Sequence, residues 1–112
     1  MTPEARYAAI VEALVGDPDV THGSDEPGAG SRFGSSGLKT GGRLFAMLVR
    51  GRLVVKLPRR RVDALVASGD GVRFDPRGDG RLMKEWLSLG PASEAEWLEL
   101  AREAREFVAS RR

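Results

Sequence analysis

The sequence of 112 residues has no cysteine, one histidine and no long apolar run. Without cysteine there is no disulfide, no thiol nucleophile and no zinc–thiolate site. Glycine, proline and acidic residues surround His22, and this composition argues against the rigid geometry of a metal site. We therefore expect no metal and no cofactor. No segment approaches the roughly 18 apolar residues that a membrane span needs.

We also expect no secretion signal, because the N-terminal stretch has an early acid, Glu4, and no apolar core. Together with the lack of cysteine this predicts a soluble protein of the cytoplasm. The length fits a single domain, which we assign to residues 1–112. No carboxylate pair or nucleophile has the spacing of a catalytic site, so we expect no catalytic residues and a protein that is not an enzyme.

Charge is unevenly distributed, although the formal net charge is only +2. Residues 31–84 hold most of the arginines and lysines, whereas residues 1–30 and 85–112 are acidic. A basic middle segment between acidic ends could attract an anionic partner. Alternatively, acidic helices could neutralise a basic sheet within one fold.

The spacing of apolar residues predicts three helices. The first covers residues 3–15, is capped by Thr2 and repeats apolar residues at i, i+3, i+4 and i+7. A second helix follows Pro58. A third is opened by Ser93 and Glu96, which have the spacing of a capping box, and it is strongly amphipathic.

Alternating apolar residues and turn residues predict an antiparallel sheet. Two-residue turns at Gly41-Gly42 and Arg50-Gly51 join its first three strands into a meander, and two further strands follow the second helix. The fold class is therefore α+β, with two layers, three helices packed mainly on one face of the sheet, and the order α-β-β-β-α-β-β-α. The segment 16–34 is expected to be a loop that is flexible over 17–31. The predicted strands are 36–39, 44–49, 53–57, 72–74 and 82–89.

Three consecutive arginines, Arg59, Arg60 and Arg61, lie in the first turn of the second helix. Cations there oppose the helix dipole, whereas the free backbone N–H groups attract anions. A phosphate or a carboxylate of a partner would suit this turn. The alternative is an exposed turn whose arginines are solvated or paired with Asp63 and with acids near the C-terminus.

Weak, sequence-nonspecific nucleic-acid binding is a second interpretation of the basic segment 43–61. Its phosphate contacts would make the affinity strongly dependent on salt. Aromatic residues suited to stacking on bases are few, since most are interpreted as core residues, namely Phe33, Phe45, Phe74 and Trp86. The contacts expected are Arg43, Arg50, Arg52, Arg59, Arg60 and Arg61.

A small-molecule binding protein or an enzyme is a third interpretation. Its pocket would lie between the 17–34 loop and the sheet. The polar residues expected to line it are Ser35, Ser36, Lys39, Lys56 and Lys84.

A pattern of glycines, apolar strands and one strand-borne lysine carries a family resemblance. It comprises RFGSSGLK at 32–39, GRLFAML at 42–48, LVVKL at 53–57, GVRFDP at 71–76 and LMKEWL at 82–87. Over about residues 1–110 the chain resembles the N-terminal domain of the TfoX/Sxy family, and it is similar to the related MmcQ/YjbR proteins.

The resemblance implies a compact antiparallel sheet with helices packed on it. TfoX proteins are linked to the regulation of DNA-uptake competence, and YjbR-like proteins are often labelled DNA-binding by fold analogy. On this resemblance we expect the first domain alone, without the helical C-terminal domain of full-length TfoX proteins. Combined with the missing catalytic set, the resemblance implies a regulatory binding module that acts through a protein partner.

Overall fold

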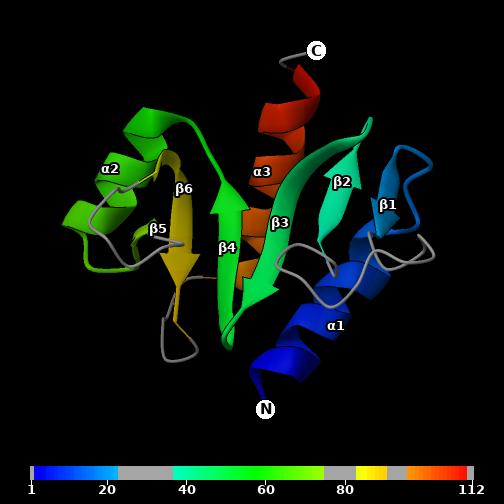
Figure 1. Ribbon diagram of the computed structural model, residues 1–112, viewed down its shortest axis with the longest axis horizontal. Coiled ribbons are helices and arrows are strands. Elements are labelled where there is room, and N and C mark those ends of the chain that lie inside the picture. Colours follow the sequence, from blue (N-terminus) through cyan, green and yellow to red (C-terminus); the bar gives the residue numbers. More distant parts are fainter. Residues whose placement is uncertain (1, 23–36, 75–82, 91–95, 111–112) are drawn as a thin grey trace.

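A computed structural model describes residues 2–22, 37–74, 83–90 and 96–110. Within these ranges the chain forms three helices and a six-stranded antiparallel sheet, which confirms the predicted α+β class (Figure 1). The strands follow the order β1-β2-β3-β4-β6-β5 across the sheet. The elements are α1 (Pro3–Leu14), β1 (Val20–His22), β2 (Leu38–Thr40), β3 (Arg43–Val49), β4 (Arg52–Lys56), α2 (Arg59–Ala67), β5 (Val72–Phe74), β6 (Met83–Leu89) and α3 (Trp97–Ser110).

The first helix begins as its sequence predicts. The backbone N–H of Ala5 donates to the Thr2 hydroxyl at 3.1 Å, so Thr2 caps the helix. The second helix follows Pro58, whose apolar side chain makes no capping hydrogen bond. The predicted cap of α3 involves Ser93, which lies outside the described residues.

Strand β1 is an addition to the predicted order. Val20 pairs with Thr40 and His22 with Leu38, so the edge of the sheet takes in part of the segment 16–34. The prediction of a loop is wrong there, because pairing with β2 buries Val20, whose flanking residues show no alternation. Residues 23–34, and with them most of the stretch expected to be flexible, lie outside the described residues.

Both predicted two-residue turns are present. Gly41 and Gly42 have φ values of 57° and 82°, and Arg50 and Gly51 have 52° and 77°. Positive φ at both positions gives the turn a twist that matches the flanking strands. The hairpins β2–β3 and β3–β4 are therefore tight, and β3 lies in the middle of a meander (Figure 1).

A bulge interrupts the alternation of β3. Leu38 of β2 lies opposite Ala46, but Lys39 lies opposite Leu44, so Phe45 is an extra residue. Phe45 and Ala46 are consequently both buried in the same core, although they are neighbours in a strand. Pairing of β3 with β4 stops at Ala46 and Val55, and the start of β3 separates from β4.

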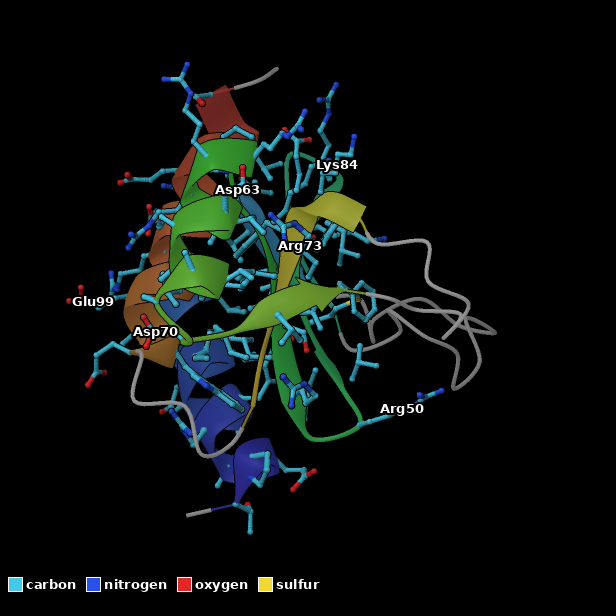
Figure 2. The ribbon with its side chains drawn as sticks, turned by 90° about the vertical axis from the view of Figure 1, so that its left-hand side faces the viewer. Arg50, Asp63, Asp70, Arg73, Lys84 and Glu99 are labelled. Carbon is cyan, nitrogen blue, oxygen red and sulfur yellow. The ribbon has the colours of Figure 1, made fainter. Side chains whose placement is uncertain are left out.

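The three helices cover one face of the sheet, as predicted (Figure 2). The core between the layers is extensive, and none of the described helices is long and apolar enough to cross a membrane. The opposite face carries a smaller cluster of Met47, Val54 and Phe74. Buried residues of the larger core include Tyr7, Ile10, Phe45, Val55, Leu87, Trp97 and Leu100.

Candidate anion-binding site at one end of the sheet

Several cations gather at the end of the sheet where β4 finishes. Since β3 and β6 both run antiparallel to β4, the starts of β3 and β6 lie at this same end. The chain also enters α2 there, three residues after the last residue of β4. Figure 2 shows Lys84 at this end and Arg50 at the other. The set, called the basic end below, comprises Arg43, Lys56, Arg59, Arg60 and Lys84.

A hollow of about 360 Å³ opens at the basic end. It lies where the start of β3, which carries the bulge, no longer pairs with β4. Its walls come from β3, β4, β6 and α3. The residues that line it are Arg43, Leu44, Lys56, Trp86 and Val108.

Lys56 and Trp86 are cross-strand neighbours within this hollow. They lie opposite each other on β4 and β6, and the Lys56 Nζ is 5.7 Å from the centroid of the indole ring. An ammonium group at this distance from the ring face is attracted by the ring quadrupole. Trp86 is half-buried, so the pair holds a cation over an aromatic surface that a ligand can still reach.

Acidic partners distinguish three arginines elsewhere in the fold from the cations of the basic end. In the described ranges each of three other arginines has an ion pair with an aspartate or glutamate, whereas no residue of the basic end has one. The basic end therefore presents positive charge that the described part of the fold does not neutralise. The three pairs are Arg61–Glu103, with Nε and Oε1 3.0 Å apart, Arg73–Asp63 and Arg105–Asp17.

The three arginines of the α2 turn do not share one environment. Arg59 and Arg60 are exposed, as the anion-site hypothesis requires. Arg61 instead pairs with Glu103 of α3, as the alternative hypothesis holds for acids near the C-terminus. Asp63, the other acid considered for this role, pairs with Arg73 of β5.

The arginines considered for nucleic-acid contacts are divided between the two ends of the sheet. Arg50 and Arg52 lie at the β3–β4 turn, and the seven residues of β3 put about 20 Å between this turn and Arg43. Arg52 is also held by β6, since its Nε donates to the Ser88 hydroxyl at 2.7 Å and its guanidinium donates to the Ser88 carbonyl at 3.3 Å.

The lysines considered for a pocket lie on three strands. Lys56 lines the hollow, and Lys84 is exposed two residues before Trp86. Lys39 of β2 lies opposite Leu44, which is itself a lining residue. Ser35 and Ser36 lie outside the described residues, as does most of the 17–34 loop.

Sequence reasoning assigned Trp86 to the core and did not consider Val108 for a site. A signal for Trp86 was available, because strand alternation places it on one face with Lys84 and Ser88. None was available for Val108, which belongs to the apolar stripe of α3 and reaches the hollow only through the packing of that helix.

The described lining of the hollow is cationic, aromatic and aliphatic, with no carboxylate, hydroxyl or imidazole group. Such a set can bind an anion but offers no acid–base pair. Across the described ranges, no three histidine, aspartate or glutamate side chains gather as a metal site would require. No family model, curated protein or solved structure matches the chain.

Proposed function

We propose that the protein is a non-enzymatic binding module that recognises an acidic partner protein through the basic end. One observation carries the proposal: in the described ranges these cations have no acidic partner, whereas Arg61 and Arg105 of the helix layer and Arg73 of β5 do. Concentrated charge of one sign attracts a complementary surface and orients it on approach. Binding without chemistry suits a regulatory role.

A relationship to the TfoX/Sxy N-terminal domain is proposed on the strength of the sequence pattern. The glycines and apolar strands at 32–57 and 71–87 support it. The regulatory role of that family agrees with a module that binds rather than catalyses.

The experiment compares two double variants in capture from cell lysate. Arg59→Gln with Lys84→Gln removes two charges from the basic end without altering the lining of the hollow. Arg50→Gln with Arg102→Gln removes two exposed charges elsewhere and is the matched control. We expect the wild type and the control to retain the same acidic protein, and the basic-end variant to lose it.

Retention should also fall when ionic strength rises from about 50 mM to about 300 mM, because salt screens exposed charges. Equal retention by the two double variants would contradict the proposal. So would a protein that elutes alone while a hydrolase or transferase screen detects activity.

Nucleic acid is the competing partner, and a mobility-shift titration at low and physiological salt tests it. The division of the arginines between two ends of the sheet argues against one continuous phosphate-binding surface. A shift that the basic-end variant loses and the control keeps would replace the protein partner with nucleic acid.

A further inference from the structure

The hollow at the basic end offers more than a charged surface. Arg43 and Lys56 supply two cations, Leu44 and Val108 supply aliphatic surface, and Trp86 supplies an aromatic ring. Its volume of about 360 Å³ falls in the range of small-ligand pockets, roughly 300–1,000 Å³. An acidic protein surface would contact the cations but would leave the apolar walls unused.

Charge indicates the anionic group of the ligand. Two cations line the hollow and, as far as the lining is described, no acid opposes them. A phosphate monoester matches this charge, because it is close to doubly negative above its second pKa of about 6. The Arg43 guanidinium can bind two phosphate oxygens side by side, and the Lys56 ammonium acts as a point charge.

The apolar walls indicate what carries the phosphate. Inorganic phosphate would leave the exposed parts of Leu44 and Trp86 in water. A compact apolar or aromatic body attached to the phosphate would cover them and gain from the area removed from water. Lys56 already lies over the Trp86 ring, so a phosphate near its ammonium would bring this body to the indole edge.

We propose that the hollow binds a phosphate monoester of a compact apolar or aromatic group. This inference deepens the proposed function and rests on it in placing an anionic ligand at the basic end. A free metabolite and a phosphorylated side chain of the partner protein both offer this chemistry, and the experiment separates the two sources.

Phenyl phosphate is the probe, and the indole N–H signals in a nitrogen–proton correlation spectrum are the readout. The chain has two tryptophans, and Trp86→Phe assigns their signals. We expect phenyl phosphate to shift the Trp86 signal saturably and to leave the Trp97 signal unchanged, since Trp97 is buried in the helix layer.

Lys56→Met and Arg43→Met each remove a charge while keeping an apolar side chain. We expect either change to weaken phenyl phosphate binding by about tenfold or more, as is usual when a charged hydrogen bond is lost. Arg50→Met makes the same change at the opposite end of the sheet and should bind as the wild type does. Unchanged melting temperatures show that the variants remain folded. Equal binding by Lys56→Met and Arg50→Met would overturn the inference.

Two further ligands test the two parts of the proposed ligand. Inorganic phosphate lacks the apolar body and benzoate lacks the second negative charge, so both should bind about tenfold more weakly than phenyl phosphate. Lowering the pH from about 7.5 to about 5.5 should also weaken phenyl phosphate binding severalfold, because the phosphate gains a proton. Inorganic phosphate that binds as tightly as phenyl phosphate would overturn the inference.

A phosphotyrosine peptide identifies the source of the ligand. Peptide binding at least as tight as that of phenyl phosphate assigns the ligand to a partner protein, and phenyl phosphate binding alone assigns it to a small molecule. Failure of the capture experiment with intact phenyl phosphate binding removes the acidic-partner proposal and leaves the hollow as a small-molecule site. If capture succeeds but phenyl phosphate does not bind, the ligand site in the hollow is ruled out and the acidic-partner proposal stands.

Discussion

The helix layer and the basic end use the same kind of residue in different ways. In the helix layer Arg61 and Arg105 reach acids from neighbouring elements, and Arg6 lies 4.0 Å from the centroid of the Trp97 ring. At the basic end the cations project from three strands and a helix start without such acids in the described ranges. The acids beside Arg61 and Arg105 therefore distinguish these two arginines from the cations of the basic end.

The comparison also separates stability from binding. Exposed ion pairs contribute only about 0.2–1 kcal/mol each, so burial of apolar side chains between the helices and the sheet must supply most of the stability. The basic end can change its charge with little effect on this core. The predictions below test that separation.

The largest effect is expected where α3 docks on the sheet. Trp97 is 2% exposed, so Trp97→Ala should lower the free energy of unfolding by about 3–5 kcal/mol. Urea denaturation measures it. Trp86→Ala is the matched control, because Trp86 is only half-buried and lies at the basic end, and it should cost less. A loss below about 1 kcal/mol for Trp97→Ala would mean that α3 does not depend on this side chain.

A pH-dependent effect is expected from Tyr7 in the helix layer. Burial raises the pKa of its phenol, so the folded protein keeps the phenolic proton at pH values where the unfolded chain loses it. The stabilisation is complete below the unfolded pKa of about 10 and is lost as the pH rises beyond that value. Denaturation between pH 9 and pH 11 measures the loss. Tyr7→Phe should reduce this dependence, and an unchanged profile in that variant would rule out Tyr7 as its source.

A smaller effect is expected from the ion pair between α2 and α3. Arg61→Met should lower the free energy of unfolding by about 0.2–1 kcal/mol, since both side chains of the pair are more than a third exposed. A double-mutant cycle with Glu103→Gln isolates the contribution of the pair. A coupling energy of zero would mean that the pair contributes nothing and that Arg61 is solvated, as Arg59 and Arg60 are.

The smallest effect is expected from Arg59 and Arg60, which directly precede Arg61 in α2. Arg59→Ala with Arg60→Ala should leave the free energy of unfolding unchanged or raise it by a few tenths of a kcal/mol per residue, because cations near a helix N-terminus oppose its dipole. Thermal melts measure the change. Phosphate should stabilise the wild type more than this double variant. A loss above about 1 kcal/mol would show that the two arginines hold the fold together and would erase the contrast with the helix layer.

Local chemistry explains why much of the fold was predictable. Thr2 caps α1 through a neighbour three residues away, and the turns at Gly41-Gly42 and Arg50-Gly51 require only positive φ at two adjacent positions. The spacing of apolar residues predicted α1 and α3, because this pattern too depends on residues only a few positions apart. Lys56, which lines the hollow, was also within reach of sequence reasoning, since it is a polar residue at the end of the mostly apolar strand β4.

Non-local contacts explain the rest. Val20 joins the sheet only because β2 is present beside it, and the bulge at Phe45 arises from how β3 pairs with β2. The hollow lies beside that bulge and is closed by Val108 of a helix distant in sequence. The sequence by itself determined the helices, the turns and the basic middle segment, because each depends on residues a few positions apart. Only the tertiary structure decided which cations meet acids and which line a hollow, because that depends on the elements that pack beside each one.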